Sequence, residues 1–200
     1  MVTEADARES GEAEPLAFYA YTPRAFGREI RLTLRESALE VNDQRRTTVI
    51  PLADIETVRL AFQPRGVMTR CFTTAIAARN GRKASFASLT AKSMLQIESQ
   101  PDSYRRFLAA LLAAVARANP ACRFAAGRPP AMWTALALVS AASLAAVIYL
   151  VAILAPQMSV GGAVGALALG AVSAWTAVEM VARNRPRRFA PDAPPPDLLP

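Results

Sequence analysis

The sequence predicts an α+β membrane protein: a small antiparallel sheet or partly closed barrel capped by one amphipathic helix, followed by a transmembrane helical hairpin. Three patterns support this fold class. Apolar residues alternate with polar ones from residue 28 onward, an apolar stripe with helical spacing begins near residue 101, and the 50 residues between Arg128 and Glu179 contain no Asp, Glu, Lys or Arg. About 20 apolar residues span the ~30 Å hydrocarbon core of a bilayer as a helix, so the uncharged run is long enough for two crossings.

The N-terminal segment, residues 1–15, is expected to form a disordered acidic arm. Residues 1–14 contain five acidic residues and one Arg, and they lack the apolar core of a signal peptide. Residues 16–122 are expected to form one strand-rich cytoplasmic domain, because this length is sufficient for one modest core.

Strands are predicted where apolar residues recur at every second position. Residues 28–35 show this pattern first, and residues 39–42 and 47–51 follow after short polar turns. The alternation resumes with the inward-facing residues Val58, Leu60 and Phe62. Since no helix intervenes to make a crossover, we expect antiparallel rather than parallel pairing.

The strongest turn pattern is Asn80–Gly81, between the predicted strands at residues 69–79 and 82–88. This dipeptide favours a type I′ hairpin turn, in which both central residues have positive φ. The same hairpin tip carries Arg79, Arg82 and Lys83, which we consider a possible contact for lipid headgroups or for an acidic partner.

An amphipathic helix is predicted over residues 101–118, with Ser99 as its N-cap and Asn119–Pro120 as its end. Its apolar residues fall at i, i+3, i+4, i+7, i+8 and i+11 and are Tyr104, Phe107, Leu108, Leu111, Leu112 and Val115. Such a helix could lie on lipid. We favour the alternative that it covers the open end of the sheet, because its stripe is narrow and has few basic residues beside it.

After a linker at residues 123–130, transmembrane helices are expected at residues 131–155 and 160–182, joined by a turn at residues 156–159. Two buried helices of a soluble protein are the alternative, but a domain of this size could not easily cover adjacent helices that are apolar on every face. Small residues recur every four positions along the second helix: Gly162, Ala166, Gly170 and Ala174. We expect them to pack against the first helix of the hairpin, and a dimer interface is the second choice.

Basic residues flank the two apolar segments and are absent from the turn between them. By the positive-inside rule, both termini are expected in the cytoplasm. The residues assigned to that membrane interface are Trp133, Trp175, Arg128, Arg183, Arg185, Arg187 and Arg188. Glu179 is expected to reach the interface and pair with Arg183, although a functional acid inside the membrane is the alternative.

The tail, residues 183–200, is first basic and then rich in proline, and it is expected to be cytoplasmic. Residues 189–200 are expected to be extended or disordered. Its terminal Leu198 and Leu199 could form a short docking peptide, but we favour an inert tail.

The residue inventory indicates no catalytic, cofactor-binding or metal-ligating site. The chain has no His, and its two cysteines, Cys71 and Cys122, form no CxxC pair and are expected to be free thiols. Residues 15–127 hold 17 basic and 8 acidic residues, a net charge of +9. Few aromatic residues accompany the arginines, so we expect membrane lipids rather than nucleic acid to attract this charge.

Residues 17–120 resemble the bacterial pleckstrin-homology-like (PH-like) domains of small membrane proteins. The resemblance rests on the strand at residues 28–35, the segment TVIPLADIETV at residues 48–58, the Asn80–Gly81 hairpin and the helix at residues 103–119. It implies a binding or scaffolding module rather than an enzyme. Many eukaryotic members bind phosphoinositides through a basic cluster between their first two strands, but here that turn is Glu36-Ser37-Ala38. This departure favours a protein partner or self-association.

The expected function is therefore that of a non-enzymatic integral membrane protein, whose cytoplasmic domain binds or scaffolds a protein partner at the bacterial inner (plasma) membrane. The alternative is an accessory subunit of a transport or envelope-biogenesis complex, in which Glu179 and the small-residue stripe carry the function.

Overall fold

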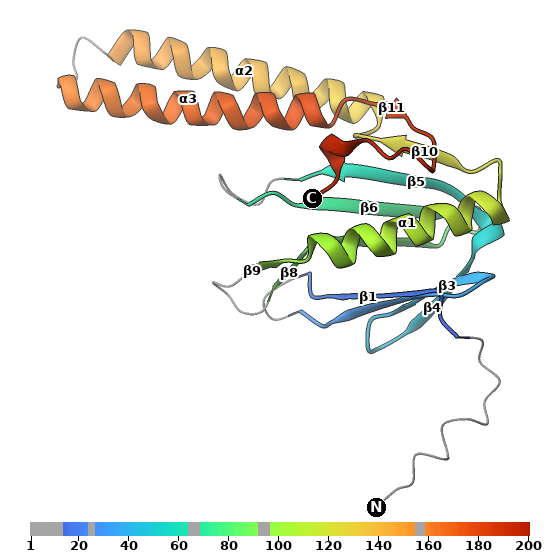
Figure 1. The fold of residues 1–200 in the computed structure, drawn as a ribbon. Coiled ribbons are helices and arrows are strands. Elements are labelled where there is room, and N and C mark those ends of the chain that lie inside the picture. Colours follow the sequence, from blue (N-terminus) through green and yellow to red (C-terminus); the bar gives the residue numbers. More distant parts are fainter. Residues whose placement is uncertain (1–13, 24–26, 64–68, 92–96, 155–158) are drawn as a thin grey trace, which may run out of the picture.

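A computed structural model describes residues 14–23, 27–63, 69–91, 97–154 and 159–200. Two sheets and one helix enclose a single core, and two long apolar helices extend from it as a pair (Figure 1). The predicted α+β class with antiparallel sheets and two C-terminal apolar helices is confirmed. The partly closed barrel is wrong, because the described strands form separate sheets.

The first sheet is an antiparallel meander of four strands in sequence order: β1 (Ala17–Tyr21), β2 (Ile30–Leu34), β3 (Ala38–Asn42) and β4 (Thr47–Pro51). Its alternation places Leu32, Leu39 and Ile50 in the core, each fully buried. The turn between β3 and β4 needs a left-handed residue, which is Gln44 at φ 65°.

The second sheet has the order β11-β10-β5-β6-β7. Its strands are β5 (Ile55–Phe62), β6 (Phe72–Ala78), β7 (Lys83–Ala87), β10 (Arg123–Ala126) and β11 (Arg187–Arg188). The purely antiparallel expectation is wrong at one pair, because β10 runs parallel to β5. Helix α1 (Pro101–Ala118) lies between these strands in the chain and allows the crossover that parallel pairing needs. Two short strands, β8 (Leu89–Ala91) and β9 (Ile97–Ser99), form a separate pair.

The β6–β7 hairpin forms as predicted, but its turn is not type I′. Gly81 has φ +78°, whereas Asn80 is not among the described residues with positive φ. The Gly81 N–H donates to Ala78 O at 3.0 Å, and the Ala78 N–H donates to Arg82 O at 2.9 Å. This pattern is a three-residue loop in which the glycine takes the left-handed position after a turn of type I geometry.

Tyrosine side chains occupy the seam between β1 and β7, where a closed barrel would pair its edge strands. The hydroxyl of Tyr19 donates to Ala87 O at 2.6 Å, and that of Tyr21 donates to Ser85 O at 2.7 Å. These hydroxyls satisfy edge carbonyls of β7, so the two sheets meet through side chains instead of a continuous ladder.

Helix α1 has the predicted bounds and buries the predicted stripe against the sheets. It starts after Gln100 rather than Ser99, and no side chain caps its N-terminus; Pro101 occupies the first turn, where its missing N–H costs nothing. Asn119 ends the helix and donates its side-chain N–H to Ile55 O at 2.9 Å. The stripe therefore faces the core, and the placement of this helix on lipid is wrong.

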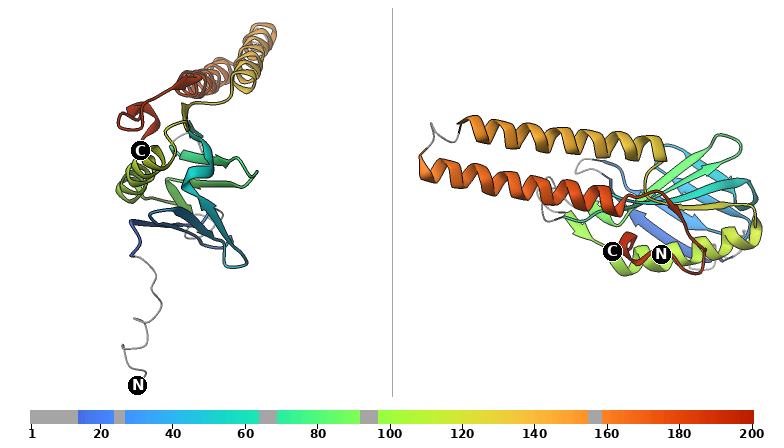
Figure 2. Two further views of the ribbon diagram at one scale, coloured as in Figure 1. Left: turned by 90° about the vertical axis from the view of Figure 1, so that its right-hand side faces the viewer. Right: turned by 90° about the horizontal axis from the view of Figure 1, so that it is seen from above.

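The hairpin consists of α2 (Pro130–Leu154) and α3 (Val160–Arg183). Ser159 caps α3 by accepting the Gly162 N–H at 3.3 Å, and residues 155–158 lie outside the described part of the chain. Both helices are long and apolar enough to cross a membrane, and no described residue in their most apolar 18-residue stretches is buried. Figure 2 shows from two sides that the pair extends beyond the sheet domain.

The C-terminal tail differs from the expected extended or disordered chain. It adds β11 to the second sheet and then forms a short 3-10 helix, η3 (Pro196–Leu198), whose Leu198 is fully buried in the core. Phe189 packs its ring against Phe124 at a centroid distance of 6.0 Å. Two contacts of Asp197 hold the turn in place: its carboxylate pairs with Arg187, and its backbone oxygen accepts from Arg183 at 2.7 Å.

Candidate functional site: the junction between the sheet domain and the hairpin

Asn184, the first residue after α3, connects the hairpin to the middle of the second sheet. Its side chain accepts the Phe62 N–H at 3.1 Å and donates to Phe62 O at 2.8 Å, so it completes the hydrogen bonding of the last residue of β5. It also donates to Met180 O in the last turn of α3 at 2.9 Å. Asn184 is fully buried, and one amide group therefore fixes the end of α3 to β5.

Gly127 makes the second connection, on the α2 side. Its N–H donates to Leu60 O at 2.8 Å, and the N–H of the next residue, Arg128, donates to Asn184 O at 3.0 Å. Gly127 has φ +76°, and an added Cβ would lie 2.4 Å from the backbone oxygens of both Asn184 and Arg185. Only glycine fits there, because any side chain would meet backbone atoms that cannot move aside cheaply.

Glu179 lies at this junction and is bound by two arginines. Its carboxylate oxygen is 2.9 Å from Arg183 Nε and 3.3 Å from Arg70 Nη2. The pairing with Arg183 is the one expected from the sequence, whereas Arg70 comes from the segment just before β6. Arg183 also lies over the Phe62 ring, 5.1 Å from its centroid. These contacts favour a structural role for Glu179 as an ion-paired carboxylate at the foot of α3.

The two tryptophans assigned to the membrane interface lie at different heights on the hairpin. Trp133 donates its indole N–H to Val181 O at 2.8 Å, so it lies at the foot of the helices. Trp175 is 73% exposed and precedes Val181 by six residues, or about 9 Å of helix. The interface arginines all flank the foot of the hairpin; of these, Arg128 has a buried Nε with no hydrogen-bond partner among the described residues.

The small residues predicted to pack inside the hairpin face α2 in part. Gly170 lies against α2, since a Cβ built on it would be 3.5 Å from Val147. Ala166 and Ala174 line the same shallow apolar groove between the helices. Gly162 lies in the first turn of α3, where its N–H is capped by Ser159.

The hairpin-tip cluster, Arg79, Arg82 and Lys83, lies far from the junction. β6 begins at Phe72, the strand partner of Phe62, and ends at Ala78 beside the tip, so the cluster is roughly 20 Å along the strand from α3. Arg79 pairs with Glu56 at 3.6 Å, and Arg82 donates to Val49 O on the edge of β4. The cluster is therefore separated from the foot of α3, although Lys83 lines a hollow on the second sheet that also contains Arg59.

The cysteines and the possible metal ligands of the described residues do not gather in one place. Cys71 and Cys122 are buried and form no disulfide, as expected, and burial raises the pKa of the Cys122 thiol to about 11. In the described part of the chain, no three His, Cys, Asp or Glu residues come close enough to hold a metal ion.

Comparisons of the chain with protein-family models, with curated proteins and with solved structures found no match.

Sequence reasoning missed the two residues that define the junction. Asn184 follows the last helical residue, a position where Asn commonly ends helices, and Gly127 stands between a short alternating segment and a helix. The sequence shows that both residues stand near the ends of predicted elements. It does not show their partners, which lie 122 residues away in the case of Asn184 and Phe62.

Proposed function

We propose that this chain is a non-enzymatic integral membrane protein of a bacterial inner membrane, with both termini and the sheet domain in the cytoplasm. The domain acts as a PH-like binding or scaffolding module for a protein partner. One observation carries the proposal: a helical pair with exposed apolar faces is joined to the folded domain by the hydrogen bonds of Asn184 and Gly127.

Exposure of the hairpin supports its insertion in a membrane. Large apolar side chains of both helices are open to their surroundings, with Leu138 66%, Tyr149 66% and Leu169 72% exposed. Core helices of soluble proteins bury such side chains, and a contiguous apolar surface of this size in water would drive aggregation. Lipid covers it instead, and the arginines at the foot of the hairpin favour the cytoplasmic side.

The junction supports a scaffolding role. A flexible linker would let the domain rotate freely beside the membrane. Here Asn184 binds the end of α3 to β5, and Gly127 binds the chain three residues before α2 to the same strand. The domain therefore presents a fixed face to the cytoplasm. Antiparallel strands β1 to β7 that precede helix α1 in the chain are also the arrangement that the PH-like resemblance implies.

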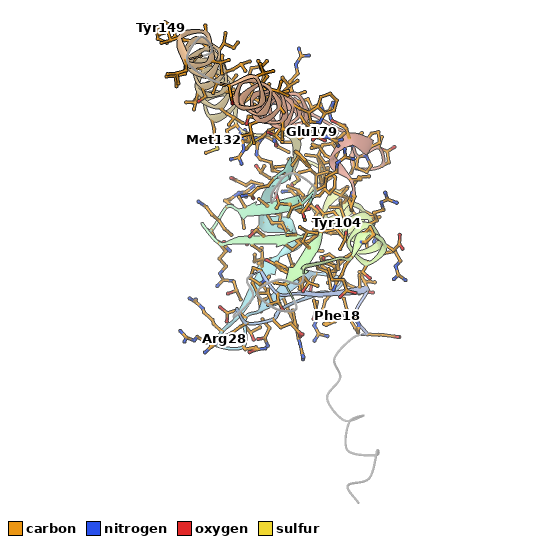
Figure 3. The ribbon with its side chains drawn as sticks, turned by 90° about the vertical axis from the view of Figure 1, so that its left-hand side faces the viewer. Phe18, Arg28, Tyr104, Met132, Tyr149 and Glu179 are labelled. Carbon is orange, nitrogen blue, oxygen red and sulfur yellow. The ribbon has the colours of Figure 1, made fainter. Side chains whose placement is uncertain are left out.

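The face turned away from the hairpin offers an apolar contact for a protein partner. Phe18 is 57% exposed and Leu16 is 48% exposed, and residues two apart in an extended chain share a face. Figure 3 shows Phe18 at the end of the molecule opposite to Met132 and Tyr149 of the hairpin. A protein bound at Phe18 would thus approach from the cytoplasm.

Photocrosslinking in native membranes tests the proposal. A photoreactive phenylalanine analogue at position 18 is expected to form an adduct with a specific protein, because Phe18 is an exposed aromatic residue outside the hairpin. The matched control carries the analogue at position 105 on the exposed face of α1. The binding-module proposal fails if position 18 yields no protein adduct beyond those obtained from position 105.

A further inference from the structure

The outer face of the second sheet carries a basic hollow at the foot of the hairpin. Cross-strand register places Arg59 of β5, Ala125 of β10 and Arg188 of β11 side by side on one face. Arg123 pairs in register with Thr57 and shares this face. Because Ala125 is small, it leaves open space between Arg59 and Arg188. The resulting hollow has a volume of about 470 Å³ and includes Arg187 at its border.

Acidic residues in the described part of the chain leave most of the positive charge in this basic hollow unpaired. Arg187 pairs with Asp197, but Arg59, Arg123 and Arg188 have no ion pair with any acidic residue that the structure describes. Arg59 is half-buried and donates one N–H to Gly127 O at 3.1 Å, which fixes its guanidinium toward the junction. Burial lowers the pKa of Arg59. A bound anion would offset that desolvation.

The position of the basic hollow indicates where its ligand comes from. Pro130, the first residue of α2, and Pro186, shortly after α3, both line it. If the hairpin spans a membrane, the hollow lies at the level where lipid headgroups meet the protein. Guanidinium groups bind phosphate oxygens through paired N–H donors, so three arginines around one open space match a phosphate ester.

We propose that the basic hollow binds the phosphate-bearing headgroup of an anionic membrane lipid, held by Arg59, Arg123 and Arg188. This inference rests on the proposed membrane insertion of the hairpin. It assigns lipid contact to the foot of the hairpin, and it leaves the cluster at Arg79, Arg82 and Lys83 free to serve another role in the cytoplasm.

Native mass spectrometry of the detergent-solubilised full chain tests this site. Phosphatidylglycerol and phosphatidylcholine are titrated separately, and the wild-type protein is expected to bind the anionic lipid more tightly. An arginine beside an anionic headgroup contributes roughly fivefold in affinity, so R59Q/R123Q/R188Q is expected to lose on the order of 100-fold for phosphatidylglycerol. Binding of phosphatidylcholine is expected to stay unchanged.

Two further variants separate loss of the headgroup site from loss of folding and from loss of charge in general. R123Q/R188Q alters only exposed side chains and retains the Arg59–Gly127 hydrogen bond, and it is expected to lose roughly 25-fold. The control R79Q/R82Q removes two charges, as R123Q/R188Q does, and leaves Lys83, which shares a hollow with Arg59, unchanged. It is expected to keep the wild-type preference. An equal loss in the control, or an unchanged preference in R123Q/R188Q, would overturn the proposal.

The source of the phosphate and the membrane insertion are tested in parallel. Excess glycerol phosphate is expected not to displace the lipid; full displacement would identify a site for free anions and overturn the assignment to lipid. Flotation of the protein with liposomes separates the two proposals. A protein that floats but shows no preference for the anionic lipid contradicts the headgroup site alone, whereas a protein that does not float contradicts the membrane insertion.

Discussion

A chain in which residues 130–182 are replaced by about six Gly and Ser residues is expected to fold as a soluble domain, whereas a chain that ends at residue 129 is not. The linker has a short distance to close, because Arg128 N lies 3.0 Å from Asn184 O, and six residues reach roughly 20 Å. The chain with the Gly and Ser linker, called the linked chain below, keeps Asn184, β11 and Leu198. Truncation at residue 129 removes all three and leaves the Phe62 backbone unsatisfied and a hole in the core.

The difference in unfolding free energy is expected to be large. Loss of a fully buried Leu costs about 2–5 kcal/mol, and unsatisfied backbone groups add about 1–3 kcal/mol each. These costs approach the whole stability of a small domain, which is about 5–15 kcal/mol. Urea titration followed by circular dichroism measures the linked chain, and size-exclusion chromatography shows whether the truncated chain aggregates.

A single substitution isolates the contribution of the tail. In the linked chain, Leu198→Ala is expected to cost about 2–5 kcal/mol, and the control Leu16→Ala, at a side chain 48% exposed, less than about 1 kcal/mol. Equal small effects would mean that the tail does not contribute to the core.

Gly127→Ala in the same linked chain is expected to destabilise the domain by roughly 2–5 kcal/mol. Left-handed backbone costs a non-glycine residue about 1–2 kcal/mol, and the new Cβ would meet two backbone oxygens, which adds about 1–3 kcal/mol as overpacking. Unfolding in urea, read by circular dichroism, gives the difference in free energy from the parent chain.

Gly81→Ala is the matched control for this substitution. Gly81 has φ +78°, close to the +76° of Gly127, but a Cβ there would have no neighbour within 4 Å. The expected cost is therefore only the backbone term of about 1–2 kcal/mol. If the two variants lose the same stability, close contact at the junction is not what excludes a side chain at Gly127.

Much of the fold was predictable because its local patterns agree with its tertiary contacts. Three patterns persist in the structure. The alternation that buries Leu32, Leu39 and Ile50 follows from one buried face of a sheet, and the stripe on α1 follows from one buried face of a helix. The uncharged run of the hairpin produces two helices that are long and apolar enough to cross a membrane. Each of these patterns involves residues that are close together in the sequence. The structure therefore retains them in the positions that their spacing predicts.

The junction and the tail were not predictable in this way. β10 has four residues and β11 has two, which is too few to show a periodic pattern. The composition of residues 189–200 predicts disorder, and only the burial of Leu198 in the core reveals their structure. The turn at Asn80–Gly81 was correctly located but wrongly typed, since the dipeptide is compatible with both hairpin geometries. Contacts between distant segments decide the structure of the junction and of the tail.

Alkaline carbonate extraction of membranes that contain the full chain, with the linked chain as control, tests membrane insertion of α2 and α3 most directly. The account predicts that the full chain stays in the membrane pellet and needs detergent for release, while the linked chain, which has the same sheet domain and no hairpin, enters the supernatant. Release of the full chain into the supernatant alongside the linked chain would contradict it.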